Sequence, residues 1–495
     1  MSPLSGRIDL DAIAEALRNG SHAGGPRFWR SLEELAQDET FQRLLDDEAA
    51  VQASLWPPEV SRRRFLTLMG VSLALAGWSG CSVRPAPSKD IVPYTRAAEE
   101  IVPGQPLFYA TTMTQGGTSV GLLAESHLGR PTKLEGNPDH PASLGATDIF
   151  AQAAVWTLYD PDRSKIVLDQ GQPSTWADAR GALVAAMNAR RKSRGRGLRM
   201  LTETIVSPTL GNQIEALLRE FPEAVWHQYE PLHRDSAYQA SQAAFGKAVG
   251  VRYDFGQAEV VLSLDADFLT TGPGNVRWAR DFMGQRHVRE AKKATAATMN
   301  RLYVAEAAVS CTGAKADHRL MLRSQEIERL ARAIAGELDV LDKSELPDAW
   351  RKWVAAVAQD LAEHRGHSLV LAGDCQPPAV HLLAHALNDH LGNVGQTVFY
   401  TDTPAVRAVD QTGSLKTLVE DMEQGRVELL IMLGGNPVYN APADFEFARR
   451  LQKVPLRAHL SLYRDETSLQ CQWHLPETHF LETWSDGRAF DGTAS

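Results

Sequence analysis

The sequence predicts an α/β protein with doubly wound, mostly parallel sheets in two lobes, and a small antiparallel sheet at the N-terminal end of the folded part. Its 495 residues, 43% of them hydrophobic, are enough for two or more domains with sizeable cores. From Thr175 onward, short apolar runs alternate with amphipathic stretches of about ten to fifteen residues, which is the pattern of βαβ units. This region is too long for one compact sheet, which favours two lobes.

The charge of the chain excludes one class of partner. It carries 51 basic and 61 acidic residues, a formal net charge of -10. Binding to nucleic acid needs clustered positive charge to neutralise phosphates. We therefore expect no nucleic-acid partner.

The chain divides into six expected segments. The helix start at Ser31, with Glu34 three residues later, predicts short helices in a cytoplasmic extension. Glycine turns at 116–117 and 128–129 split β-prone runs into a small antiparallel sheet. The expected segments are the extension 1–60, an export signal 61–81, a proline-rich tether 82–105, a small β-rich domain 106–174, an α/β lobe 175–340, and a second, truncated α/β lobe 341–495.

The two lobes are predicted from alternating segments. The candidate strands are "LRMLT", "EVVLSLDA", "HSLVLAG", "QTVFYT", "ELLIMLGGN" and "LRAHLSL". The stretches between them have apolar residues at helical spacing, as in "SQEIERLARAIAGEL".

The stretch "SRRRFLTLMGVSLALAGWSGC" reads as an export signal that begins late, at Ser61. A basic cluster precedes an apolar run over 65–76, which is shorter than the roughly 20 residues that span a bilayer. The alternative is a short buried helix after a basic turn. The run resembles a twin-arginine (Tat) signal, in which the receptor would recognise Arg62, Arg63, Phe65 and Leu66.

Cys81 closes the signal and resembles a lipoprotein cleavage site, where it would become acylated. Trp78 departs from that pattern, which prefers a small or aliphatic residue three positions before the cysteine.

Several motifs in one order resemble a known family. These are an early "FWRSLEEL" block, "KLEGNPDHPASLG", "STWADA", "ALNDHLGNVGQTV", "LIMLGGNPVYNAP" and "CQWHLPETHFLETWSD". Together they resemble the variant Tat-translocated molybdopterin oxidoreductase-like proteins, and in particular the N-terminal part of the large iron-sulfur subunit of bacterial alternative complex III. The resemblance implies a dimethyl sulfoxide reductase-like fold.

The cysteines depart from the cluster-bearing members of that fold. A [4Fe-4S] cluster takes four thiolates, commonly from closely spaced pairs. The chain has no such pair among its four cysteines, and Thr147 and Asp148 stand where the resembled enzymes have their last cluster ligand. We expect no cluster and no catalytic centre in this chain.

Four residues could belong to vestigial pterin-binding loops. Asp265 and Asp267 follow a predicted strand, where they could meet a ligand or cap the turn, and we favour the cap. Gly434 and Asn436 lie in a glycine turn after another strand, which could cradle phosphates but completes no dinucleotide fingerprint.

Two histidines four residues apart raise the question of a metal. His381 and His385 share one face of a predicted helix, but no third ligand is assignable, so we expect a structural pair and no bound metal.

The resemblance implies a non-catalytic module within a membrane-bound quinol-oxidising respiratory complex. Its expected partners are the Tat translocase, a polytopic membrane quinol-binding subunit, an iron-sulfur domain or subunit, and multiheme cytochrome c subunits. The expected location is the periplasmic face of the cytoplasmic membrane. The alternatives are an active oxidoreductase with a bis-pterin molybdenum or tungsten centre (molybdopterin guanine dinucleotide), and a solitary binding lipoprotein. Iron-sulfur clusters would lie in a missing C-terminal half or in a partner.

Overall fold

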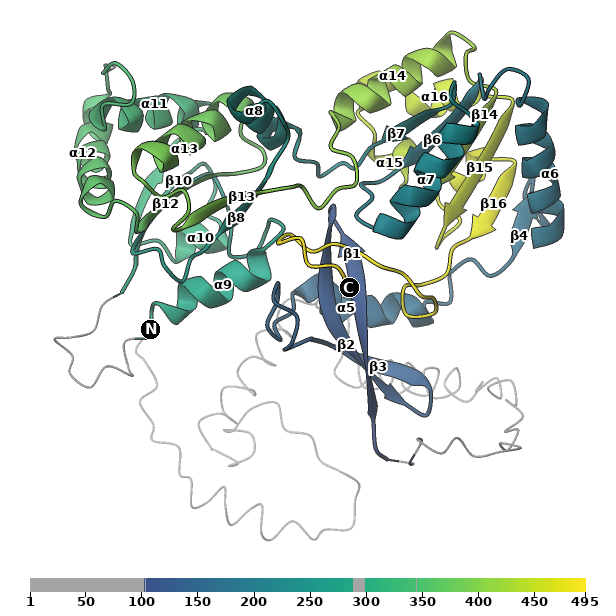
Figure 1. Ribbon diagram of the computed structural model, residues 1–495, viewed down its shortest axis with the longest axis horizontal. Coiled ribbons are helices and arrows are strands. Elements are labelled where there is room, and N and C mark those ends of the chain that lie inside the picture. The colour runs from purple at the N-terminus through teal and green to yellow at the C-terminus, as the bar shows by residue number, and fades with distance from the viewer. Residues whose placement is uncertain (1–101, 103, 288–298, 344) are drawn as a thin grey trace, which may run out of the picture. The chain divides into compact units, whose positions relative to one another are not determined.

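The computed structural model describes residues 102, 104–287, 299–343 and 345–495, which form a small antiparallel sheet and two α/β lobes (Figure 1). The expected cytoplasmic extension, the export signal and nearly all of the tether lie outside the described residues. The same is true of Arg62, Arg63, Phe65, Leu66 and Cys81. None of the described helices combines the length and the apolar character needed to cross a bilayer.

The small sheet confirms the predicted antiparallel element. Its strands are β1 (Leu107–Gln115), β2 (Thr118–His127) and β3 (Arg130–Gly136), paired in that order. Gly116 and Gly117 both have positive φ, as does the pair Leu128 and Gly129, so each hairpin closes through a two-residue turn whose backbone twist matches the strands. Helix α5 (Ile149–Tyr159) packs on β3 and completes a small core.

The four-stranded lobe contains a parallel sheet in the order β11-β10-β9-β12. Its strands are β9 (Val260–Leu264), β10 (Arg301–Glu306), β11 (His318–Met321) and β12 (Ser368–Ala372). A separate antiparallel pair joins β8 (Gly250–Tyr253) to β13 (Val398–Thr401). The helices are α8 (Asp235–Phe245), α9 (Asn275–Gly284), α10 (Cys311–Ala314), η3 (Ser324–Glu326), α11 (Ile327–Glu337), α12 (Asp348–Glu363) and α13 (Pro378–His390).

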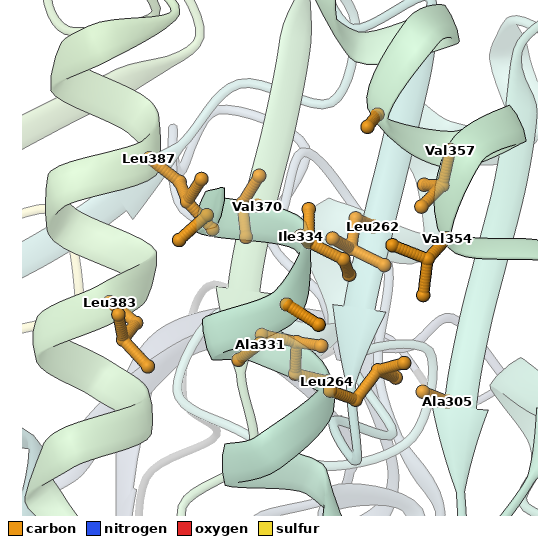
Figure 2. Packing of buried hydrophobic residues seen from close by; sticks show 14 of the residues in the cluster. Leu262, Leu264, Ala305, Ala331, Ile334, Val354, Val357, Val370, Leu383 and Leu387 are labelled. Carbon is orange, nitrogen blue, oxygen red and sulfur yellow. The ribbon is translucent and has the colours of Figure 1, made fainter. Parts of the chain in front are cut away.

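Both faces of this sheet are buried, which explains the continuous apolar run of β9. Leu262 and Leu264 face α11, α12 and α13, where Ile334 and Val354 meet them (Figure 2). Val261 faces the opposite side, toward the aromatic residues of α9. Helices on both faces are typical of parallel sheets, because each βαβ crossover places a helix on the sheet.

The seven-stranded lobe has a mostly parallel sheet in the order β5-β4-β16-β15-β14-β6-β7. Its strands are β4 (Val167–Asp169), β5 (Gln172–Ser174), β6 (Leu198–Thr202), β7 (Val225–Gln228), β14 (Leu429–Leu433), β15 (Leu456–Ser461) and β16 (Trp473–Pro476). The helices are α6 (Trp176–Ala189), α7 (Pro208–Glu220), α14 (Gln411–Glu423), α15 (Pro437–Asn440), η4 (Ala443–Phe445), α16 (Phe447–Leu451) and η5 (Ser468–Gln470). Residues of α14 and α16 pack on one face, and residues of α6 and α7 on the other.

Strand pairing crosses the expected lobe boundary between residues 340 and 341. The chain completes β7, builds the four-stranded lobe, and returns to place β14 beside β6. The four-stranded sheet likewise takes β12 from beyond that boundary. Each lobe is therefore assembled from both halves of the segment 175–495.

Candidate functional site at the strand ends

Ligands of open α/β sheets bind beyond the carboxyl ends of the strands, where the strand order reverses. In the four-stranded lobe this point lies between β9 and β12, and in the seven-stranded lobe it lies between β6 and β14. The residues that follow these four strands are the candidate site.

Asp265 follows β9 and binds protein groups. It has a φ of 57°, and its Oδ2 accepts hydrogen bonds from Ser324 Oγ at 3.1 Å and from Gln376 Nε2 at 2.7 Å. Gly373, directly after β12, lies so close that an added Cβ would be 2.0 Å from the Asp265 carbonyl oxygen. Asp265 therefore joins the loops that follow β9, β11 and β12.

Asp267 has a similar role two residues later. Its Oδ1 accepts hydrogen bonds from the backbone N–H of Thr312 at 2.8 Å and from Thr312 Oγ1 at 2.7 Å, while Oδ2 accepts one from Thr270 Oγ1. These contacts fix the loop after β9 to the start of α10. Both aspartates thus use their carboxylates to hold turns together, the role favoured for them from the sequence.

The glycine turn after β14 faces a carboxylate. Gly434 and Gly435 have φ values of 69° and 70°. A Cβ added at Gly434 would lie 3.2 Å from Glu203 Oε2. Asn436 donates from Nδ2 to Glu466 Oε2 at 2.7 Å and accepts from Thr467 Oγ1 at 2.8 Å, so it joins the loops after β14 and β15.

Glu203 follows β6 and is the most perturbed carboxyl group of the site. Burial, with repulsion from Glu230 and Glu477, raises the pKa of Glu203 from an ordinary value of 4.5 to about 7. Its side chain is still accessible to solvent, so water reaches a carboxylate that protein atoms otherwise surround. No side chain in the described part of the chain donates a hydrogen bond to it.

Two further carboxyl groups come from neighbouring strand ends. Glu230 is two residues beyond β7 and Glu477 follows β16, and burial raises the pKa of each. Glu230 accepts a hydrogen bond from Thr204 Oγ1, and Gly117 at the tip of the β1–β2 hairpin lies beside both residues. The strand ends of this lobe therefore gather three glutamates.

Sequence reasoning did not single out these glutamates as a group. Each stands at or just beyond the end of a short apolar segment, in "LRMLTE", "VWHQYE" and "WHLPE". That signal was present, but only the strand order brings the three ends to one edge of a sheet.

The remaining residues singled out from the sequence are Asp148, His381 and His385. Asp148 caps α5, because its Oδ1 accepts a hydrogen bond from the backbone N–H of Ala151 at 2.8 Å.

Burial lowers the pKa of His381 and that of His385, the latter to about 4, and His385 Nδ1 lies 3.0 Å from Tyr400 Oη. Within the ranges described, no group of three or more histidine, cysteine, aspartate or glutamate side chains could hold a metal ion.

The cysteines of the described chain are separated from one another. Cys311 and Cys375 are exposed and Cys471 is buried, all three as free thiols. Burial raises the pKa of the Cys471 thiol to about 12, which keeps it protonated and unreactive at neutral pH.

No family model matches the chain. The menaquinone reductase, molybdopterin-binding-like subunit of Nitratidesulfovibrio vulgaris is 25% identical over an alignment of 414 residues that covers 74% of this chain and 58% of that protein. The chain thus spans somewhat more than half the length of this relative.

A solved structure settles the fold. Acetylene hydratase from Pelobacter acetylenicus superposes with a TM-score of 0.55 and 11% identity, over 77% of this chain and 65% of the other. The chain has the dimethyl sulfoxide reductase fold. This confirms the fold class expected from the sequence.

That fold implies a molybdopterin-type dinucleotide at the strand ends, and the residues present do not fit one. The pyrophosphate of a dinucleotide needs N–H donors and positive charge. In the seven-stranded lobe the Glu203 carboxylate adjoins the glycine turn, with Glu230 and Glu477 nearby. In the four-stranded lobe, protein donors already engage Asp265 and Asp267.

Proposed function

We propose that this chain is a non-catalytic, molybdopterin oxidoreductase-like module of a membrane-bound quinol-oxidising respiratory complex of the alternative complex III type. It would hold iron-sulfur, membrane and cytochrome subunits together. The observation that carries the proposal is the composition of the strand ends, where carboxylates and internal hydrogen bonds replace the donors that an anionic cofactor requires.

The similarity to a menaquinone reductase subunit supports the respiratory setting of this proposal. We propose the same respiratory setting for the present chain. We further propose that the Tat translocase exports it through Arg62 and Arg63, that it resides at the periplasmic face of the membrane, and that Cys81 is acylated.

An exposed apolar stripe on α5 supports a docking role. Ile149, Phe150, Trp156 and Tyr159 are exposed on this helix, and Ile149 and Trp156, seven residues apart and 76% and 78% exposed, share one face. Large aromatic side chains at such exposure are typical of surfaces that a protein partner covers. A scaffold subunit needs surfaces of this kind.

Purification in mild detergent with metal and heme analysis tests the proposal. We expect co-purifying heme and iron-sulfur subunits, without stoichiometric molybdenum, tungsten or pterin fluorescence. Stoichiometric metal with pterin would instead establish the active oxidoreductase and refute the non-catalytic role. Recovery of the chain alone, with neither cofactor nor partners, would refute the scaffold and favour a solitary binding lipoprotein.

A variant pair tests the docking surface. Trp156→Asp should reduce recovery of partner subunits, because it places a charge in the apolar stripe. Leu232→Asp is the matched control, since Leu232 is 84% exposed and lies outside α5. Equal recovery with the two variants would contradict a docking role for α5.

A further inference from the structure

A polar cavity of about 390 Å³ lies beside the β4–β5 turn of the seven-stranded lobe. This volume is within the range of small-molecule sites. The polar residues that matter for its chemistry are Gln170, Gly171, Arg457, Arg464, Gln470 and His474. No aspartate or glutamate lines it, although the whole chain has a net charge of -10.

Two arginines in the wall lack a counter-ion. Neither Arg457 nor Arg464 forms an ion pair with any carboxylate in the described ranges. By contrast, the buried Arg199 is paired with Asp421 at 2.6 Å, and Arg319 is paired with Glu306 at 2.5 Å. Arg457 is half-buried and Arg464 is exposed, so the wall of the cavity presents two positive charges that no carboxylate in the described ranges pairs with.

Backbone carbonyl groups hold the Arg457 guanidinium in place through two of its three nitrogen atoms. Its Nε donates to the Gln470 carbonyl at 2.7 Å and its Nη1 donates to the Val454 carbonyl at 2.6 Å, whereas Nη2 has no partner among the described residues. Burial lowers the pKa of Arg457 from its ordinary value. The guanidinium is therefore positioned by the backbone and keeps one nitrogen free.

Two buried polar atoms of the wall also lack partners within the described chain. His474 is 2% exposed, and its Nδ1 makes no hydrogen bond while its Nε2 lies 2.6 Å from Ser164 Oγ. Burial lowers the pKa of His474 to about 4, so the ring is neutral at pH 7 and can present Nδ1–H when Nε2 accepts from Ser164. The Gln470 Oε1 atom is likewise buried and unpartnered. Buried polar groups without partners are uncommon in folded proteins.

A glycine lies at the entrance beside Arg464. Gly171 has a φ of 80°, and an added Cβ would be 3.0 Å from Arg464 Nη2. Its lack of a side chain leaves room next to the guanidinium.

From these features we infer that the cavity binds a small oxyanion, either a carboxylate or a phosphate group, through Arg464 and the free nitrogen of Arg457. Guanidinium groups suit this task because their N–H groups match the geometry of carboxylate and phosphate oxygens. The site is separate from the three glutamates, since it lies at the β4–β5 turn, η5 and the start of β15. It goes beyond the proposed function, which assigns no ligand to this lobe.

Isothermal titration calorimetry on the purified full chain tests the site. Inorganic phosphate and citrate are titrated separately, at constant ionic strength in a chloride buffer. We expect the wild type to bind at least one of them, with the stronger response showing whether phosphate or carboxylate is preferred. Absence of binding by both at millimolar concentrations would overturn the inference.

Three variants separate the cavity from general surface charge. Arg464→Gln should weaken binding by about 10-fold or more, because a charge-assisted hydrogen bond is lost. Gln470→Glu should abolish binding by placing a carboxylate at the buried Oε1 position. Arg196→Gln is the matched control, since Arg196 is exposed and lies outside the cavity.

Each variant must first melt as the wild type does in the absence of the anion, and Arg464 is suited to this because it is exposed and forms no internal ion pair. If Arg464→Gln binds as the wild type does, the site is refuted. If Arg196→Gln loses as much affinity as Arg464→Gln, the binding is general surface attraction and the inference also fails.

Discussion

The pKa of Glu203 makes the stability of the protein depend on pH in a defined direction. In the unfolded chain this carboxyl group titrates near 4.5, and in the folded chain near 7. Between these values the folded state keeps a proton that the unfolded state releases. The free energy of unfolding therefore falls as pH rises from about 4.5 to about 7, and the loss is complete above that range.

The variant Glu203→Gln removes this dependence. At about 1.4 kcal/mol per pKa unit, the difference between 4.5 and about 7 gives an upper limit of about 3 kcal/mol for a fully buried group. Because water reaches the Glu203 side chain, we reduce this to about 1–2 kcal/mol. We expect the variant to be more stable than the wild type by this amount at pH 8, and by about half of it at pH 5.

Urea unfolding followed by tryptophan fluorescence from pH 5 to pH 8.5 measures the effect. Glu223→Gln is the control, since Glu223 is exposed and its carboxylate contacts no described side chain in a hydrogen bond or ion pair. A difference between Glu203→Gln and the wild type that is the same at pH 5 and pH 8 would refute a raised pKa for Glu203.

Three further predictions concern the cores of the two lobes. Asp421→Asn should lower the free energy of unfolding by about 3–5 kcal/mol at pH 7, because it leaves the buried Arg199 without its partner; a loss below about 1 kcal/mol in urea unfolding would contradict this. Leu262→Ala should lower the free energy of unfolding by about 2–5 kcal/mol in the same assay, because the fully buried Leu262 side chain of β9 packs against three helices (Figure 2). A loss near zero would contradict this, because it would mean that the core closes over the space left by the side chain. Gly313→Ala should lower the melting temperature sharply, because the added Cβ would lie 1.7 Å from Oε1 of the buried Glu306, and an unchanged melting temperature would contradict this packing.

Each of these three variants has a control of the same chemical type. Asp444→Asn and Leu232→Ala alter exposed side chains, and Gly181→Ala adds a methyl group with no atom within 4 Å. Asp444→Asn and Leu232→Ala should unfold close to the wild type, and Gly181→Ala, in the exposed interior of α6, should raise stability by up to about 1 kcal/mol.

The sequence predicted β6, β9, β12, β13, β14 and β15, and it missed β7, β8, β10, β11 and β16. β9 and β14 read as apolar runs because helices cover both sides of their sheets. β7 and β16 are only four residues long and carry the buried histidines His227 and His474, so little apolar pattern is left to recognise them by. The predicted strand "QTVFYT" exists as β13, but it pairs antiparallel with β8 and belongs to neither parallel sheet.

Some contacts of the candidate residues are local in the chain, whereas others depend on the tertiary structure. An aspartate just after a strand predicts a local cap, and Asp267 does accept a hydrogen bond from Thr270, three residues further on. Its hydrogen bonds from Thr312 come from a distant part of the chain and follow from the tertiary structure. The raised pKa of Glu203 depends instead on Glu230 and Glu477, which are far from it in the chain. No local pattern reports such a shift.

The sequence by itself determined the class of fold, the glycine turns of the small sheet and the apolar character of the buried strands β9 and β14. These features depend on neighbouring residues, on backbone conformation and on whether a segment must be covered on one face or two. Only the tertiary structure decided that β6 pairs with β14, and hence that three glutamates share one sheet edge and that Arg457 and Arg464 share a wall without a carboxylate. The physical reason is that desolvation and charge interaction act through space, between groups that the order of residues in the chain leaves far apart.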